Sequence, residues 1–248
     1  MAKKPDFSIV IPIKEEAESI GYLLDETGYA IKTDYFYEII LVDDGSMDNT
    51  RNMISQYMTC SPIQITCFRH DRNYGQSAAL LTGIRGAMAD WIITMDGDGQ
   101  NDPADIKTLL NELKKHKTDD PRLICGRRIK RKDNFVKRYS SKIANTFRSY
   151  LLGDEAPDTG CGLKLIHRET FLKLPHFDHM HRFLPALFKN HGYTVCHVDV
   201  NHRYRMSGQS KYGIQNRLWA GLIDTAGLIW LNRRSLQPYT EEVLSCDN

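Results

Sequence analysis

The sequence predicts an α/β fold with a doubly wound, mostly parallel sheet, and three observations lead to this prediction. Short apolar runs that favour β-structure recur in the first half of the chain, beginning with Phe7–Ile11 and Tyr37–Val42. Apolar residues at helical spacing follow each run, and a polar loop lies between each run and its helix. Strands that alternate with helices over residues 5–116 are typical of a parallel sheet, in which the loops after the strands gather at one edge.

The first two strand and helix pairs are clear in the sequence. After the first strand come Pro12 and an acidic loop, and helical spacing begins near Glu16. After the second strand, Asp48 is expected to cap a helix that starts near Asn49.

Two more strands are expected at Ile63–Phe68 and Trp91–Met95. The helix between them should begin after Tyr74 and turn four residues toward the sheet: Ala78, Ala79, Leu81 and Ile84. The helix after the fourth strand should have Pro103 in its first turn and an apolar stripe of Ile106, Leu109, Leu110 and Leu113.

Composition narrows the class of protein. With 248 residues, 41% of them apolar, the chain can form one α/β domain with an elaboration. A net charge of +2 does not favour a nucleic-acid partner. The six cysteines show no CxxC spacing and no signal peptide is recognised, which predicts reduced, mostly buried thiols in a cytosolic protein. No apolar run approaches the roughly 18 to 20 residues that span a bilayer.

The loop after the fourth strand carries the most specific chemistry. Asp96 and Asp98 follow the strand in the sequence DGDGQ, and two such carboxylates can share a hard divalent cation, Mg or Mn, that also holds a diphosphate. Ordinary turn chemistry explains Asp and Gly here about as well. An EF-hand is excluded because Asn101 and Lys107 stand where Gly and Glu are needed. A phosphatase with an aspartate nucleophile is a minor alternative, since Gln100 replaces the expected hydroxyl residue.

Asp44, after the second strand, suits a nucleobase. A lone carboxylate can accept a hydrogen bond from a base N–H, whereas it would repel a phosphate. A capping role is nearly as probable for Asp48 but less so for Asp44. Together the loops predict a site for a nucleoside-diphosphate donor.

Cations follow a further strand that is expected to end at Gly126. Residues 127–142 hold a dense run of Arg and Lys, and such a run is usually a solvated face. At this edge of the sheet, however, Arg128 and Arg138 suit bidentate phosphate binding, and Lys211 suits charge neutralisation. Glycine and serine around Lys211 are typical of a loop that closes over a donor, and equally of an exposed turn.

The motifs, in order, resemble glycosyltransferase family 2. They are SIVIPIKEEAE, ILVDDGSMDNT, RNYGQSAAL, MDGDGQNDP, CGRR, DTGCGLK, MHRFLPAL and RMSGQSKYG. The later motifs are similar to the dolichol-phosphate mannose synthase and bacterial polyprenyl-phosphate glycosyltransferase group, and the resemblance extends to about Arg234. It implies the GT-A fold, a nucleotide-sugar donor and a polyprenyl-phosphate acceptor.

The resemblance also implies roles for single residues. The nucleoside pocket would be lined by Pro12, Glu16, Val42 and Asp44. Asp98 would be the main metal ligand with Asp96 beside it, and Gly97 and Gln100 would lie in the donor site. The lipid phosphate would be held by Arg128, Arg138 and Ser141, and the donor phosphates clamped by Arg205 and Lys211. This chain departs from the family at Lys14 and Glu15, where Tyr and Asn are frequent, so the identity of the base is open.

The implied reaction needs no general base. A polyprenyl phosphate oxygen is already anionic and can attack the sugar C1 directly, with inversion, while the diphosphate leaves. The residues expected to act on the reacting groups are Asp98, Arg128, Arg205 and Lys211. His179 and His181 suit a surface or structural role better than a metal pair, although the resemblance brings His181 near the acceptor. Asp158 either orients the acceptor or holds its own loop.

Three segments are expected: a catalytic domain over 1–212, an amphipathic helix over 213–234 and a tail over 235–248. One face of the helix carries apolar residues, including two tryptophans, which suits an interfacial helix on a membrane. A helix packed on the core or in an oligomer contact has the same pattern. The expected location is therefore peripheral, on the cytosolic face of a membrane.

The predicted function is inverting transfer of a hexose, with mannose favoured, from GDP-mannose or a UDP-hexose to a polyprenyl or dolichyl phosphate. One alternative is an enzyme of the same fold that acts on a soluble or cell-surface glycan. The other is a nucleotide-sugar-binding module without turnover.

Overall fold

The computed structural model describes residues 3–31, 34–116, 121–129, 152–204 and 214–234. The chain divides into two compact units, Met1–Lys211 and Tyr212–Asn248. The second unit contains one described element, the helix α8 (Ile214–Arg234). The first unit contains the following elements: β1 Phe7–Ile13, α1 Ile20–Ile31, β2 Tyr37–Asp43, α2 Thr50–Cys60, β3 Gln64–Arg69, α3 Gln76–Gly86, β4 Trp91–Thr94, η1 Pro103–Asp105, α4 Ile106–Lys115, β5 Leu123–Arg128, β6 Lys164–His167, α6 Arg168–Lys173, η2 Met180–Arg182, α7 Leu184–Asn190 and β7 Val195–Val200.

The strands form one seven-stranded sheet in the order β3-β2-β1-β4-β6-β5-β7. Neighbouring strands are parallel except at β6, which runs antiparallel to both β4 and β5. Because two reversals cancel, β5 points the same way as β4, and the carboxyl ends of β1, β2, β4 and β5 all lie at one edge. The predicted mostly parallel α/β sheet is confirmed. β5 continues to Arg128 and does not end at Gly126.

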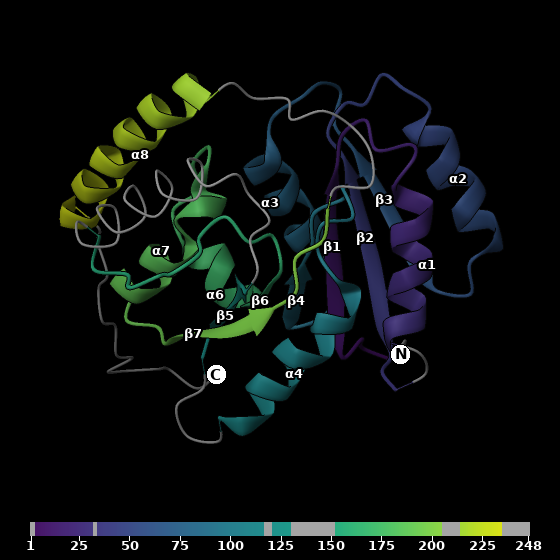
Figure 1. Ribbon diagram of the computed structural model, residues 1–248, viewed down its shortest axis with the longest axis horizontal. Coiled ribbons are helices and arrows are strands. Elements are labelled where there is room, and N and C mark those ends of the chain that lie inside the picture. Colours follow the sequence, from purple (N-terminus) through teal and green to yellow (C-terminus); the bar gives the residue numbers. More distant parts are fainter. Residues whose placement is uncertain (1–2, 32–33, 117–120, 130–151, 205–213, 235–248) are drawn as a thin grey trace, which may run out of the picture. The chain divides into compact units, whose positions relative to one another are not determined.

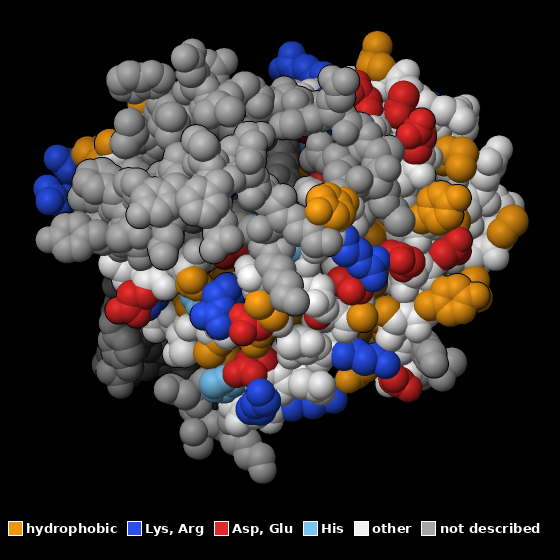
Figure 2. Space-filling view, in the orientation of Figure 1, with side chains coloured by type: hydrophobic (Ala, Val, Ile, Leu, Met, Phe, Trp, Pro, Cys, Tyr) orange, Lys and Arg blue, Asp and Glu red, His pale blue; other side chains and the backbone are white. Residues whose placement is uncertain are grey.

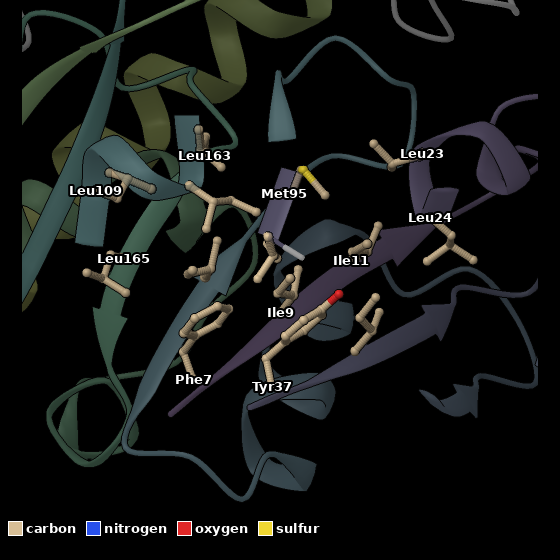
Figure 3. Close-up of a cluster of buried hydrophobic side chains, with 14 of the residues drawn as sticks. Phe7, Ile9, Ile11, Leu23, Leu24, Tyr37, Met95, Leu109, Leu163 and Leu165 are labelled. Atoms are coloured by element: carbon tan, nitrogen blue, oxygen red, sulfur yellow. The ribbon is translucent and has the colours of Figure 1, made fainter. Parts of the chain in front are cut away.

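Helices cover both faces of the first three strands. In β1, Ile9 and Ile11 point into a core that also contains Leu23 and Leu24 of α1 (Figure 3). Alternate side chains point the opposite way, since Val10 lies directly under Gly83 of α3. Figure 1 shows the same arrangement, with α1 and α2 on one side of β1 and β2, and α3 on the other.

The face of α3 that meets the sheet is partly different from the prediction. Ala79 and Ile84 are buried as expected, but Ala78 and Leu81 are only half-buried. Leu80 is buried instead, together with Gly83. The prediction was partly wrong because four consecutive small or apolar residues, 78–81, fit more than one helical stripe.

Replacement of Gly83 by Ala is expected to lower the free energy of unfolding by about 1–3 kcal/mol, because the new methyl group would overlap the Val10 side chain. Urea unfolding followed by circular dichroism measures this. Gly21→Ala in α1 is the matched control, since nothing lies within 4 Å of the added group. That variant should be unchanged or up to about 1 kcal/mol more stable. Equal stability of the two variants would contradict the close packing of α3.

The cysteines are less buried than expected. The five described cysteines are free thiols, and only Cys125 and Cys161 are buried, while Cys60 is exposed.

On the face seen in Figure 2, acidic and basic side chains are interspersed with isolated apolar ones over the described surface. Scattered apolar side chains of this kind are normal for a protein surface.

The helix of the second unit, α8, covers Ile214–Arg234, where a helix over 213–234 was expected. Ile223 and Trp230 of α8 are exposed, and the Arg234 guanidinium lies 5.9 Å from the centre of the Trp230 ring. Among the described helices, none is both long and apolar enough to span a bilayer.

Candidate active site

The loops after β1 and β4 contact each other at the carboxyl edge of the sheet. A Cβ atom placed on Gly97 would lie 3.0 Å from the Pro12 carbonyl oxygen and 3.7 Å from Cγ of Glu16. The Gly97 carbonyl accepts a hydrogen bond of 3.0 Å from the Ser19 hydroxyl of the loop before α1. Three residues predicted for the donor site are therefore neighbours, and a side chain at position 97 would disturb them.

Asp44 is a buried carboxylate at the end of β2. Its Oδ1 accepts hydrogen bonds from the Tyr74 backbone N–H at 2.8 Å and from Nδ1 of His70 at 2.7 Å. Its Oδ2 accepts from the Gly75 backbone N–H at 2.8 Å. Asp44 thus ties the end of β2 to the loop before α3. Asp48 Oδ1 accepts the backbone N–H of Thr50, the first residue of α2, at 3.1 Å, while the N-cap residue of this helix is Asn49.

The other residues expected in the nucleoside pocket lie close by. Val42 is fully buried between β1 and β3 and its side chain packs toward Gly83, so the structure does not expose this side chain to a ligand. Lys14 Nζ lies 3.4 Å from the carbonyl oxygens of both Asp44 and Gly45. Glu15 has a φ of 53°, a left-handed conformation that Asn adopts more readily. This conformation gives a physical reason for the frequent Asn at this position in the family that the motifs resemble.

Asp96 and Asp98 form the acidic corner after β4. Asp96 Oδ1 accepts a hydrogen bond of 2.8 Å from the Gln76 side chain, and the Asp96 backbone N–H donates to Asn101. Asp98 Oδ1 accepts from the Gln100 N–H at 3.1 Å, which closes the turn. Burial and then the neighbouring Asp98 carboxylate raise the pKa of Asp96, although the cations of Lys164 and Arg128 act against this.

The acidic corner fits a divalent cation that is coordinated partly by the protein and partly by a substrate. The two carboxylates supply hard oxygen atoms, and the electrostatic repulsion between them is relieved when a cation binds. Within the described ranges, no group of three or more His, Cys, Asp or Glu side chains is arranged to hold a metal ion. A cation held by these two carboxylates would complete its coordination with water or with oxygen atoms of a bound phosphate group.

Arg128 lies at the same edge, at the end of β5, in a buried ion pair with Asp158. Its Nε and Nη2 donate to the two Asp158 carboxylate oxygens at 2.7 and 2.8 Å. The two side chains are only 13% and 6% exposed. Burial alone would lower the pKa of Arg128, but the Asp158 carboxylate outweighs it and raises the pKa. Of the two roles predicted for Asp158, the structure contains the contact that holds its own loop.

The loop that carries Asp158 returns beneath the acidic corner. The Thr94 hydroxyl donates to the Gly162 carbonyl at 2.7 Å, and the buried Lys164 ammonium donates to the Cys161 carbonyl. The Gly162 backbone lies directly against the Asp96 carboxylate. The ion pair and the acidic corner are therefore held together by one loop.

His181 also meets the start of α3. The Ser77 hydroxyl donates to His181 Nδ1 at 2.8 Å and accepts from the His181 backbone N–H. Burial, followed by the cations of Lys164 and Arg182, lowers the pKa of His181 to about 3. The ring is therefore neutral with its proton on Nε2, in agreement with the expected structural role.

The remaining predicted residues are placed only in part. Gln100 is half-buried, and its carbonyl accepts a hydrogen bond of 3.0 Å from the Arg203 N–H. Arg203 itself pairs with Glu26 and Asp102 at 2.8 and 2.7 Å. Four predicted site residues lie outside the described residues: Arg138, Ser141, Arg205 and Lys211.

Three residues of this site were not predicted: Gln76, Asn101 and Lys164. Each lies inside one of the motifs. Gln76 contacts Asp96 over 20 positions of sequence, Asn101 accepts a hydrogen bond from the Asp96 N–H five positions away, and the Lys164 cation acts on the pKa of Asp96 from β6. The amide and ammonium groups have no local pattern that indicates a partner. The order of the strands brings Gln76 and Lys164 to the acidic corner, whereas Asn101 belongs to the same loop as Asp96.

The metal-free Asp96→Asn variant is expected to be more stable than the wild type at pH 7. The pKa of Asp96 is raised in the folded protein, so Asp96 binds a proton more tightly there than in the unfolded chain. Ionisation of Asp96 therefore lowers the free energy of unfolding as pH increases. Thermal unfolding in EDTA should show a midpoint higher by about 2–4 °C, and the gain should shrink as pH falls toward 5. A lower midpoint at pH 7 would contradict this interpretation of the corner.

The family model described as Glycosyl transferase family 2 matches residues 8–174. The dodecaprenyl-phosphate galacturonate synthase of Rhizobium johnstonii is 33% identical over 237 residues, which cover 94% of this chain and 69% of that protein. The undecaprenyl-phosphate 4-deoxy-4-formamido-L-arabinose transferase of Shewanella sediminis is 32% identical over 210 residues, 84% of this chain and 62% of that protein.

Solved structures share the fold. Glucosyl-3-phosphoglycerate synthase from Mycobacterium tuberculosis, in complex with Mn²⁺, UDP and glucosyl-3-phosphoglycerate, aligns with a TM-score of 0.67 at 16% identity, covering 92% of this chain and 80% of that one. A mannosyltransferase from Pyrobaculum calidifontis, in complex with GDP-Man and Mn²⁺, aligns with a TM-score of 0.65 at 21% identity, covering 95% and 66%. The expected GT-A fold is confirmed. The family match and the identity to the galacturonate synthase show that this chain belongs to glycosyl transferase family 2.

Proposed function

We propose that this protein transfers a sugar from a nucleoside diphosphate to a polyprenyl phosphate, with inversion at the sugar C1 and with Mg or Mn as cofactor. The observation that carries the proposal is that three kinds of group meet at one sheet edge. They are the Asp44 carboxylate for a base, the Asp96 and Asp98 pair for a cation with diphosphate, and the Arg128 guanidinium for an acceptor phosphate. The names of the two relatives, which both contain a polyprenyl phosphate, support the acceptor.

The sugar is proposed more broadly than in the sequence-based prediction. The names of the relatives contain galacturonate and a formamido-arabinose, so mannose has no particular support from them. The mannosyltransferase and the glucosyl-3-phosphoglycerate synthase resemble this chain in fold alone. Nucleotide donors of hexoses, uronic acids and amino-pentoses should therefore all be tested.

The residues would act mainly by positioning and by charge. An acceptor phosphate is already anionic, so it needs orientation rather than deprotonation, and Arg128 keeps N–H donors beyond the two used by Asp158. His181 is neutral and bonded to Ser77, which agrees with a mechanism without a histidine base. A divalent cation at Asp98 and Asp96 would supply positive charge beside the donor diphosphate. Arg205 and Lys211 are proposed to add charge there.

A location at the cytosolic face of a membrane is part of this proposal. The exposed Ile223 and Trp230 of α8 and the arginines at its end are the side chains that an interfacial helix uses. Flotation with liposomes that contain anionic lipid tests it. Trp230→Ser should reduce the floated fraction, and an unchanged fraction would favour a helix that packs on protein.

A panel of donors tests the reaction. Purified protein with Mn²⁺ or Mg²⁺ is mixed with labelled GDP-mannose, UDP-glucose, UDP-galacturonate and a UDP-amino-pentose, with and without a short polyprenyl phosphate. Label that enters the organic phase with one donor, and is lost in EDTA, supports the function. Transfer to a soluble glycan alone would replace the lipid acceptor, and binding of a donor without transfer would favour the binding module.

A further inference from the structure

The imidazole of His70 lies between Asp44 and Thr82, just past the end of β3. Nδ1 of His70 is 2.7 Å from Asp44 Oδ1, and Nε2 is 2.9 Å from the Thr82 hydroxyl of α3. We propose that His70 is a positioning residue for nucleobase recognition, and that it holds the Asp44 carboxylate in the one orientation that can accept a hydrogen bond from the base. This inference rests on the proposed function, since it assumes that Asp44 faces a nucleotide.

The acceptor positions of Asp44 are almost filled. A carboxylate offers about four lone-pair positions. Within the described chain, Oδ1 uses two of them for His70 and Tyr74, and Oδ2 uses one for Gly75. The remaining lone-pair position is on Oδ2. If the carboxylate rotated by half a turn, Oδ2 would move away from the base and its place would be taken by Oδ1, which already accepts two hydrogen bonds. The orientation of the group therefore decides whether a base N–H finds a partner.

His70 is the side chain that can fix this orientation. Its side chain is 14% exposed and that of Asp44 is 6% exposed, so water competes weakly for their bond. A carboxylate accepts only, so Nδ1 of His70 must carry a proton. In the neutral ring Nε2 is then an acceptor, and the Thr82 hydroxyl donates to it. The Tyr74 ring packs edge-on against the imidazole at 5.4 Å and limits its rotation.

Thr82 extends the support into a rigid element. It lies in the middle of α3, one residue before Gly83, where the helix contacts the sheet most closely. The hydrogen bonds from Thr82 to His70 and from His70 to Asp44 therefore fix the Asp44 carboxylate relative to α3.

Four variants separate this role from simple stabilisation. In His70→Asn, the amide can replace Nδ1–H and donate to Asp44, whereas in His70→Gln the longer side chain places its amide toward Thr82. Thr82→Val removes the hydroxyl from a side chain of similar shape, and Thr82→Ser retains it. Binding of GDP, UDP and inorganic diphosphate is measured for each by calorimetry with Mn²⁺ at pH 8, and thermal unfolding confirms that each variant is folded.

His70→Gln and Thr82→Val are expected to bind the preferred nucleoside diphosphate about tenfold more weakly, since a hydrogen bond to a charged group is misplaced. His70→Asn and Thr82→Ser should bind it nearly as the wild type does. All four should bind inorganic diphosphate normally, because it has no base. ¹⁵N NMR of the wild type should show the His70 proton on Nδ1.

Other outcomes overturn the inference. Unchanged nucleotide binding in His70→Gln would mean that Asp44 needs no such support. A parallel loss for inorganic diphosphate would mean that His70 only stabilises the fold. Asp44→Asn is the reference: if it weakens nucleotide binding and His70→Gln does not, the inference alone is wrong. If the wild type binds neither GDP nor UDP, the proposed function fails and the inference fails with it.

Discussion

Asp98→Asn is expected to lower the rate of sugar transfer by about a thousandfold or more while the fold stays intact. The substituted amide oxygen can still accept the hydrogen bond from the Gln100 N–H that Asp98 Oδ1 accepts at 3.1 Å, so the turn after β4 should persist. What is lost is one negative charge at the proposed cation. Groups that stabilise charge at a reacting centre have effects of this size. Initial rates at saturating donor, together with Mn²⁺ binding by electron paramagnetic resonance, measure both consequences.

The control for Asp98→Asn is the same substitution at the other end of β4. Asp90 lies just before the strand, its side chain is 67% exposed, and it pairs with Lys4. Asp90→Asn should leave both the rate and the Mn²⁺ affinity unchanged, because exposed pairs contribute little. If Asp98→Asn bound Mn²⁺ as the wild type does and retained its rate, the acidic corner would not be the metal site.

Asp158→Asn is expected to lower the free energy of unfolding by about 3 kcal/mol and to impair transfer. The substitution leaves the Arg128 guanidinium buried without its countercharge, and broken buried pairs have effects of this order. Urea denaturation gives the free energy, and the transfer assay gives the activity.

A double variant separates charge from packing. In Arg128→Met with Asp158→Leu, both charges are replaced by apolar groups, so most of the lost stability should return. Activity should remain low, because the guanidinium proposed for the acceptor phosphate is missing. A stable and fully active double variant would show that Arg128 has no part in the reaction.

The sequence predicted the strands near the site well because each is an apolar run followed by polar residues. β1, β2, β3 and β4 lie within two residues of their expected bounds. The reversed direction of β6 could not be read from the sequence, because a strand of four residues, Lys164–His167, has no pattern that fixes its direction. Its direction follows from pairing with β4 and β5, which is a property of the assembled sheet.

The candidate site was predictable in its acidic residues and not in their partners. Asp44, Asp96 and Asp98 are indicated by their places after strands, and the structure places all three at the edge. The ion pair of Arg128 with Asp158 spans 30 positions. Either residue alone could serve a ligand, and only the fold shows that each is already bound to the other.

The first turn of α3 has a consequence for how this region can change during evolution. The N–H of Gly75, the residue just before the helix, donates to Asp44, the side chain of Gln76 donates to Asp96, and the Ser77 hydroxyl donates to His181. Each residue of a helix is rotated by about 100° from the one before it. A single inserted or deleted residue here would turn all later contacts away from their partners at once. Substitutions can therefore accumulate in this segment one at a time, whereas its length should be held constant among functional descendants.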